Sequence, residues 1–280
     1  DYWAYTLDAK DQAFIEESVK TDPDVDLRVR MLHISGLVSA GRNNAIFLAN
    51  GYDVPEAARL RGERWAWNTT NGLPLQNFGK PGAIIGNGLG RLLDCESTYT
   101  GPKYILPDGN YTAQERPFHC KNPRLTFSAT TEAAQVNAIE LPISGLYDGG
   151  FRELDLRVVQ MPLAEAQRLL DTDKLTMVVV HLKPKRDIWA FIKRVRAAAE
   201  SKGLSLDVLH WSEHKAANYV RGGLQILHVF RNLFMGIVVA IGVMSVANTM
   251  MKAVNERIRE IGTLRSLGFR QKQMITMFSL

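Results

Sequence analysis

An uncharged apolar run stands out near the C-terminal end of the chain. Residues 232–251 read NLFMGIVVAIGVMSVANTMM and contain no ionisable side chain. At a rise of 1.5 Å per residue, twenty helical residues span about 30 Å, which is the hydrocarbon thickness of a bilayer. The run therefore predicts a transmembrane helix. A buried core helix is the less favoured alternative, because core helices rarely run this long without a charge.

The remaining pattern predicts a mixture of strands and helices. Alternating apolar and polar residues predict strands at 25–37 and 45–49. Pro162 and Asp187 suit helix starts, so helices are expected at 162–170 and 187–202. The second of these lies between apolar runs at 175–182 and 206–209, an order typical of a βαβ or split βαβ unit. Residues 61–142 differ in composition, since they hold seven of the eleven prolines and both cysteines.

We therefore predict an α+β extracytoplasmic domain in two parts. Residues 1–60 and 141–215 form a strand–helix subdomain, and residues 61–140 form an inserted β-rich subdomain. Residues 216–251 form a stalk and the transmembrane helix, and residues 252–280 form a cytoplasmic segment. No proline interrupts residues 212–251, so the helix is expected to be nearly continuous there. The pair Gly222 and Gly223 is its weak point and a candidate hinge.

The charge distribution orients the chain in the membrane. Lys and Arg number 34 and Asp and Glu 29, and residues 252–280 carry +4 of the net charge of +5. Positive charge flanking a membrane helix stays in the cytoplasm, so the tail is expected inside and residues 1 to about 220 outside. An external N-terminal part also implies an earlier membrane segment before Asp1. The basic excess is one short segment, so no nucleic-acid partner is expected.

Two cysteines, Cys95 and Cys120, fit an oxidising compartment. A disulfide between them would close a loop of about 25 residues and stabilise the fold by about 3 kcal/mol. Two unpaired buried thiols are the alternative.

Motifs for catalysis are missing from the sequence. His210 and His214 have a spacing that zinc ligands use, but no third ligand is evident. The run from Gly86 to Gly90 resembles a dinucleotide-binding loop, but its third glycine comes one residue early, so a turn before a short helix is preferred. Neither a Walker A motif nor a G-x-S-x-G elbow occurs. We therefore predict no catalytic, cofactor-binding or metal-binding residue, and no enzyme.

The segment after the apolar run carries a specific motif. Val254, Ile258, Ile261 and Leu264 recur at helical spacing, with charges on the other face and Gly268 as an expected break. Residues 255–268, NERIREIGTLRSLG, resemble the cytoplasmic segment of FtsX-like ABC transporter permeases of the MacB and lipoprotein-releasing types. The family pattern is roughly E-R-x-R-E-I-G-x-L-R-A-L-G, and this chain departs from it only at Ser266. Residues 82–90 and 143–155 resemble that family's periplasmic core more loosely.

This resemblance implies a permease of the bacterial inner membrane that transmits ATPase motion to a periplasmic domain. The cargo would be a lipoprotein, a peptide or a drug-like molecule. The implied partners are an ABC ATPase, a second permease copy or paralogue, the lipid bilayer, and a periplasmic adaptor or lipoprotein. ATP would be bound by the ATPase, and further membrane spans would follow Leu280. The residues that would contact the ATPase are Asn255, Glu256, Arg257, Arg259, Glu260, Ile261, Gly262, Leu264, Arg265 and Gly268.

Two other functions remain open from the sequence. An FtsX-like protein can instead be a regulator that activates a periplasmic hydrolase. A membrane-anchored sensor, with an outer ligand domain that signals through one helix, is a second alternative.

Overall fold

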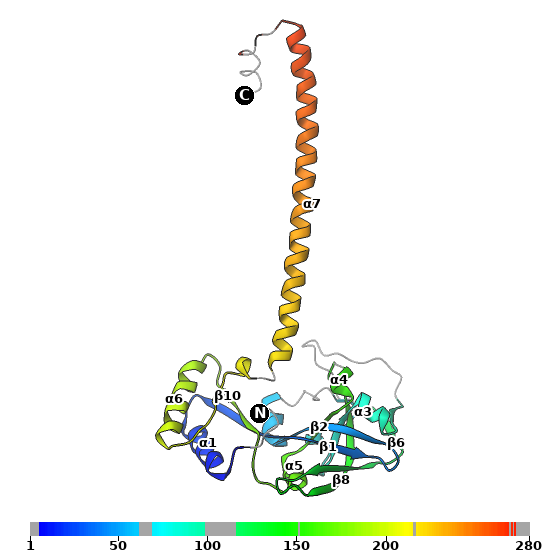
Figure 1. The fold of residues 1–280 in the computed structure, drawn as a ribbon, viewed down its shortest axis with the longest axis vertical. Coiled ribbons are helices and arrows are strands. Elements are labelled where there is room, and N and C mark those ends of the chain that lie inside the picture. The colour runs from blue at the N-terminus through cyan, green and yellow to red at the C-terminus, as the bar shows by residue number, and fades with distance from the viewer. Residues whose placement is uncertain are drawn as a thin grey trace. The chain divides into compact units, whose positions relative to one another are not determined.

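The computed structural model describes residues 6–61, 69–98, 116–150, 152–214, 217–268, 270 and 272. The chain divides into two compact units, residues 1–210 and 211–280. Each is described by itself below (Figure 1). Parts of the predicted insert, 62–68 and 99–115, and the tail at 273–280 lie outside the described residues.

The first unit is mixed α/β. Its helices are α1 (Ala9–Thr21), α2 (Val54–Arg61), α3 (Asn87–Leu92), α4 (Arg152–Asp155), α5 (Leu163–Leu170) and α6 (Ile188–Ser201), with a 3-10 turn η1 (Leu75–Asn77). Its strands are β1 (Val25–Ser39), β2 (Asn44–Tyr52), β3 (Thr69–Gly72), β4 (Ala83–Gly86), β5 (Cys95–Ser97), β6 (Phe118–Cys120), β7 (Arg124–Thr130), β8 (Val136–Tyr147), β9 (Val158–Pro162) and β10 (Met177–Leu182).

Six of these strands close into a ring. β1 pairs with β2, β2 with β9, β9 with β4 and β4 with β8. β8 then pairs with β7, and β7 returns to β1 through Leu37↔Ser128, Val38↔Phe127 and Ser39↔Thr126. Such closure removes the free edges of these strands where they pair. The result is a small barrel inside an eight-stranded sheet, whose other two strands attach outside the ring, β10 on β1 and β3 on β8.

The barrel interior is filled by side chains, as expected for a barrel with few strands. Alternate residues of the six strands point inward and belong to one buried cluster. Phe47 and Phe127 meet at its centre, with ring centroids 5.4 Å apart in an edge-to-face arrangement. Side chains of α5 and α3 join the same cluster, and so does Leu175. The strand residues of the cluster include Leu32, Ile34, Val38, Phe47, Ala49, Ala83, Ile85, Leu125, Phe127, Ile139, Leu141, Val159 and Met161.

A second lobe extends from the first half of β1. Residues 25–31 pair with β10, and α1 and α6 lie beside this pair (Figure 1). Asp8 caps α1 in a reciprocal box with Asp11, and Asp187 caps α6 through the N–H groups of the next turn. Ion pairs join the helices to each other and to the loop before β1: Lys202–Glu17 at 2.7 Å and Arg194–Asp22 at 2.9 Å.

The predicted α+β class is confirmed, but the division into subdomains needs correction. The described strands of residues 61–140 do not form a sheet of their own, apart from the short β5–β6 pair. β3, β4, β7 and β8 instead share the large sheet with β1, β2 and β9. The physical reason is long-range backbone pairing, which composition does not report. The lobe with α1, β10 and α6 is separated from the barrel by a change of partner along β1 at Met31.

The strand predicted at residues 206–209 is also wrong, since this stretch forms no ladder with any described strand. Its exposure still alternates residue by residue. The Val208 carbonyl instead accepts hydrogen bonds from the Arg196 side chain of α6, at 3.0 and 2.6 Å. The alternation of apolar and polar residues therefore predicted the alternating exposure of this segment but not whether it pairs with another strand.

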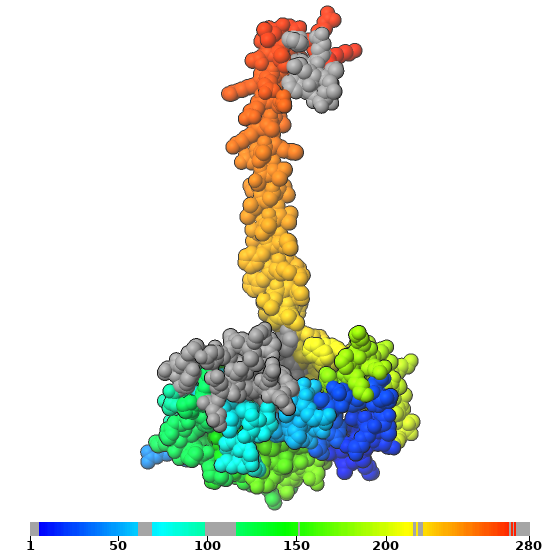
Figure 2. Space-filling view, turned by 180° about the vertical axis from the view of Figure 1, so that it is seen from behind, coloured from blue at the N-terminus to red at the C-terminus, as the bar shows by residue number. Residues whose placement is uncertain are grey.

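The second unit is dominated by one helix, α7 (Ala217–Ser266), preceded by a 3-10 turn η2 (Trp211–Glu213). α7 begins five residues later than expected and passes through Gly222 and Gly223 without interruption. It also continues 15 residues beyond Met251. By length and composition it can cross a membrane, and its most apolar window is wholly exposed. Figure 2 shows its side chains projecting outward along the helix.

Closure of the ring depends on Gly36. A Cβ atom there would lie 2.2 Å from the backbone oxygen of Ser128 and 2.9 Å from the Phe47 ring. We expect Gly36→Ala to lower the free energy of unfolding by about 2–3 kcal/mol, because backbone and a packed ring must both shift. The unfolding midpoint in denaturant, followed by tryptophan fluorescence, measures this.

Ser35→Ala is the matched control, since Ser35 is the exposed neighbour in the same strand. Its midpoint should stay close to that of the parent chain. Equal midpoints for Gly36→Ala and Ser35→Ala would show that closure tolerates a side chain at residue 36.

Candidate functional site

The predicted ATPase-contact residues lie on the last turns of α7. Val254, Ile258 and Ile261 follow one another at helical spacing on one side. Val254 and Ile258 are exposed, while Ile261 and Leu264 are half-buried. Apolar side chains in this arrangement form a stripe that a partner surface or a membrane edge can cover.

The charged residues of this segment occupy the remaining surface. Glu256 and Glu260 are one turn apart, so their carboxylates lie on the same side of the helix. Arg257 Nη1 donates to Glu260 Oε2 at 2.9 Å, and both side chains are mostly exposed. An exposed pair of this kind contributes about 0–1 kcal/mol to stability. Loss of this pair would therefore cost the helix little stability.

The helix ends where the sequence predicted a break. Gly268 has a φ of +91°, a left-handed conformation that glycine adopts without strain. Its N–H donates to the Arg265 carbonyl at 3.1 Å, and Leu267 N–H donates to Thr263 at 3.2 Å. Such bonds satisfy carbonyl groups at a helix C-terminus. The structure thus brings residues 255–265 together on one helix and places Gly268 just beyond it.

Cys95 and Cys120 lie directly opposite each other in the β5–β6 pair and form a disulfide. Both are buried and belong to the cluster that fills the barrel. This cross-link holds the β5–β6 pair next to α3. Of the two alternatives for these cysteines, the structure has the bonded one.

The two other motifs weighed from the sequence have structural explanations. A Cβ on Gly86 would lie 2.2 Å from the Asp155 backbone oxygen, so the glycine run permits close packing against the end of α4. His210 stacks on Trp189 with ring centroids 5.3 Å apart. Within the described ranges, no group of three His, Cys, Asp or Glu side chains is placed to hold a metal ion.

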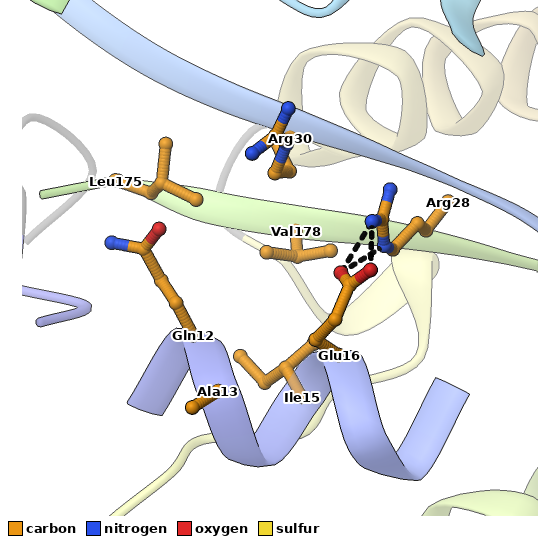
Figure 3. Close-up of a pocket in the computed structure, with 8 residues that line it drawn as sticks. All are labelled: Gln12, Ala13, Ile15, Glu16, Arg28, Arg30, Leu175 and Val178. Carbon is orange, nitrogen blue, oxygen red and sulfur yellow. Dashed lines mark hydrogen bonds and ion pairs between the residues drawn. The ribbon is translucent and has the colours of Figure 1, made fainter. Parts of the chain in front are cut away.

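A pocket that the sequence did not predict lies in the second lobe (Figure 3). It has a volume of about 250 Å³ and is formed between α1 and the paired strands β1 and β10. Its residues are Gln12, Ala13, Ile15, Glu16, Arg28, Arg30, Leu175 and Val178.

An ion pair crosses this pocket from strand to helix. Arg28 Nε donates to Glu16 Oε2 at 2.6 Å, and Arg28 Nη2 also contacts the same carboxylate (Figure 3). The hydrogen bonds and charge of Arg28 lower the pKa of Glu16 despite partial burial. The same contact raises the pKa of Arg28. The pair therefore holds the middle of α1 against β1.

Sequence reasoning missed this pocket because a segment near residue 175 packs against α1 and β1, far from it in the sequence. Glu16 and Arg28 are twelve residues apart, whereas Val178 lies in β10 and Leu175 just before it. Only the alternation along β1 hinted at it, since Arg28 and Arg30 share one face of a strand.

Residues 232–280 match the family described as FtsX-like permease C-terminal. The C-terminal part of the chain is thus similar to the C-terminal part of FtsX-like permeases, and the resemblance carried by residues 255–268 is confirmed.

Two solved structures are similar to this chain. One is the extracellular domain of the noncanonical ABC-type transporter YknZ from Gram-positive bacteria, at 12% identity and a TM-score of 0.44, covering 69% of this chain and 84% of that one. The other is the periplasmic region of MacB from Actinobacillus actinomycetemcomitans, at 8% identity and a TM-score of 0.42, covering 68% of this chain and 74% of that one.

The Glu16–Arg28 pair predicts a pH dependence of stability. The folded pKa of Glu16 lies below its unfolded value, so its contribution is complete above about pH 4.5 and is lost as pH falls through the folded pKa. At pH 7 we expect Glu16→Gln to lower the free energy of unfolding by about 1 kcal/mol, allowing for the partial exposure of the pair. At pH 3 the free energies of unfolding of the Glu16→Gln variant and the parent chain should be nearly equal, because Glu16 is then largely protonated. Thermal unfolding of both proteins between pH 7 and pH 3 measures this difference in free energy at each pH.

Glu140→Gln serves as a control, because Glu140 is mostly exposed and 3.6 Å from Arg124. A constant difference between Glu16→Gln and the parent chain at all pH values would mean that the carboxylate charge is not the cause.

Proposed function

We propose that this chain is the part of an ABC transporter permease that transmits ATPase motion to an extracytoplasmic domain. The C-terminal match to FtsX-like permeases supports the class. The observation that carries the mechanism is the continuity of α7, which runs for 50 residues from Ala217 to Ser266. A single helix then connects the outer domain along the chain with the segment that would meet the ATPase.

The length of α7 suits this role. Fifty residues extend about 75 Å, whereas the hydrocarbon core of a bilayer needs about 30 Å. With residues 232–251 in the membrane, about 22 Å of helix remain on each side. Where such a helix stays ordered, a displacement or tilt at one end is carried to the other. The cytoplasmic end is then a lever for the outer domain.

The segment 255–268 is the proposed coupling site. Its apolar stripe would lie in a groove of the ATPase or at the membrane edge, and its charges would face the ATPase surface. Charges at an interface set orientation and partner choice more than raw affinity. The ten residues proposed to act in coupling are Asn255, Glu256, Arg257, Arg259, Glu260, Ile261, Gly262, Leu264, Arg265 and Gly268.

Location and partners follow from the same proposal. Residues 1 to about 220 are periplasmic and 252–280 cytoplasmic, in the inner membrane of a bacterium, because the positive charge lies after the apolar span. The Cys95–Cys120 disulfide supports an oxidising compartment for the outer domain. The proposed partners are the ATPase, a second permease copy or paralogue, and a periplasmic adaptor or lipoprotein.

Charge reversal in the coupling segment tests the proposal. We expect the double variant Glu256→Lys, Glu260→Lys to keep membrane insertion and the outer fold but to lose most transport, roughly tenfold or more. The reason is that two like charges would face a surface selected for opposite ones. Transport and stimulated ATP hydrolysis in the reconstituted complex measure the effect.

The control is the double variant Glu153→Lys, Glu200→Lys, which makes the same change of charge at two exposed residues of the outer domain. Lipid contact alone predicts the reverse outcome, because added lysines bind anionic headgroups more strongly. Normal coupling in the Glu256 and Glu260 variant would contradict the docking role of this segment.

Substitution of Gly222 and Gly223 tests whether transport needs a flexible site in α7. No atom lies within 4 Å of a Cβ added at Gly222 or Gly223, so alanine fits at both positions. Replacing both should stabilise the helix by about 2 kcal/mol and reduce its bending. If these residues form a hinge, transport should fall while ATP binding is unchanged. Transport assays with spin-label distances across the stalk give the answer.

A second variant, in which the two glycines are moved along the helix, distinguishes the effect of a hinge from the effect of a more stable helix. Adding Leu224→Gly and Gln225→Gly to the alanine pair restores a flexible site two residues further along. Recovery of transport would support a hinge in this turn. Unchanged transport and unchanged spin-label distances in the alanine variant would contradict it.

A further inference from the structure

The outer edge of β10 is an open sheet edge. β10 ends the path of strands, since it pairs with β1 on one side and with no described strand on the other (Figure 1). Its residues read MVVVHL, without proline, lysine, arginine or an acidic residue, and Val179 in the middle is 38% exposed. The register shift of this ladder lies in β1, between Val25 and Leu27. Exposed strand edges normally carry a charge, a proline or a bulge that prevents pairing, so an unprotected edge indicates a partner strand.

The hydrogen bonds just before β10 show which backbone groups face this edge. Leu175 N–H donates to the Leu7 carbonyl and the Leu175 carbonyl accepts from Leu7 N–H, both at 3.1 Å. Thr176 N–H instead donates to the Met31 carbonyl of β1 at 3.0 Å. Successive residues of a strand direct their backbone groups to opposite edges. Every second residue of β10, beginning with Met177, therefore presents its N–H and carbonyl to the open edge.

A second copy of β10 fits this edge in one antiparallel register. With a two-fold axis at Val179, the two Val179 residues face each other and Met177 of each copy faces His181 of the other. All these residues direct their backbone groups to the open edge, so each pair can exchange both of its hydrogen bonds. A shift of the axis by one residue in either direction leaves Met177 or His181 without a partner in β10. The edge is therefore complementary to itself.

The charges at the two ends of β10 favour the same antiparallel orientation. Asp171 and Asp173 precede the strand and Lys185 follows it; all three are exposed and form no ion pair with a described residue. The neighbouring Lys183 and Arg186 are already bound within their own lobe. In the antiparallel register, Lys185 of each copy lies level with Asp173 of the other. Opposite charges on neighbouring strands stabilise their pairing, and like charges oppose it.

We propose that β10 is the surface through which the outer domains of two copies of this chain pair, so that one sheet continues through β10 of both copies. This deepens the proposed function and rests on it for the presence of a second permease copy. The contact is small beside the roughly 1,200 Å² that stable interfaces bury. Pairing therefore depends on the membrane anchors, which keep the two copies at a high effective concentration.

Cysteine crosslinking in the intact, membrane-embedded permease–ATPase complex tests the proposal. In this register the two Val179 Cα atoms would lie about 5.5 Å apart, a distance that a disulfide spans. Oxidation of Val179→Cys with copper–phenanthroline should give a disulfide-linked dimer, at least about fivefold more than Val136→Cys gives. Val136 is the matched control, an exposed valine of β8, and the native cysteines are already bonded to each other. The parent chain, oxidised in the same way, gives the background.

A mixed-pair experiment tests the register. Met177→Cys and His181→Cys chains that carry different tags are produced together and oxidised. They should crosslink to each other and not to themselves, because like residues of the two copies would lie about 13 Å apart along the strands. Equal amounts of mixed and self-linked dimers would contradict the register.

A charge exchange tests the contribution of the strand ends. Lys185→Glu would place like charges at both ends of the pair, so the dimer yield of Val179→Cys should fall about fivefold. Adding Asp173→Lys to the same chain restores opposite charges and should restore the yield. Circular dichroism shows whether each variant remains folded.

Three results would overturn the proposal: a Val179→Cys dimer yield no higher than that of Val136→Cys, crosslinking of Val179→Cys to a paralogous permease or an adaptor instead of a second copy, or no recovery in the folded charge-exchange variant. The Glu256→Lys, Glu260→Lys variant should crosslink normally at Val179→Cys. Failure of the coupling role and failure of this contact are therefore separate results.

Discussion

The short contact between β1 and β7 determines the architecture of the outer domain. Three register pairs at Leu37–Ser39 turn a path of strands into a closed ring. Without them β7 would remain attached only through β8, and the Phe47–Phe127 contact would lose its enclosure. β7 can lie this close to β1 only because residue 36 is glycine, since any side chain there would meet the Ser128 carbonyl. One missing methyl group thus permits a barrel whose interior holds most of the buried side chains.

The same strand also joins the two lobes. β1 pairs with β10 up to Met31 and with β2 from Met31 onward, so its backbone is continuous between the open sheet and the barrel. A strand held by ladders at both ends resists bending between them. Relative motion is therefore easier for α1, which buries only Phe14 and is otherwise held by polar contacts such as Glu16–Arg28. The pocket between α1, β1 and β10 lies at this weakly held boundary.

Local patterns predicted the elements well, and long-range pairing limited the rest. The alternation of β1, the Asp187 cap of α6 and the uncharged span in α7 are all properties of adjacent residues. The pairing of β7 with β1 joins residues about ninety positions apart and leaves no local trace. The strand expected at 206–209 failed for the same reason, since alternation reports exposure and not the presence of a neighbour. The motif at 255–268 predicted the candidate coupling site, whereas the pocket could not be predicted because residues 175–178 are far from α1 and β1 in the sequence.

The exposed ends of α7 place a constraint on how such a helix can work. Within the bilayer, residues 232–251 need no partner to stay helical, because backbone groups must be satisfied internally there. In the proposed topology the turns at 217–231 and 252–266 would lie outside the bilayer, and isolated helices of about 15 residues are marginal in water. Leu224, Leu227 and Phe230 before the apolar span, and Val254 and Ile258 after it, are exposed apolar side chains that a covering partner would stabilise. A helix ordered at both ends by its partners is stiff only while they are bound. Transmission through α7 would then depend on the occupancy of both ends.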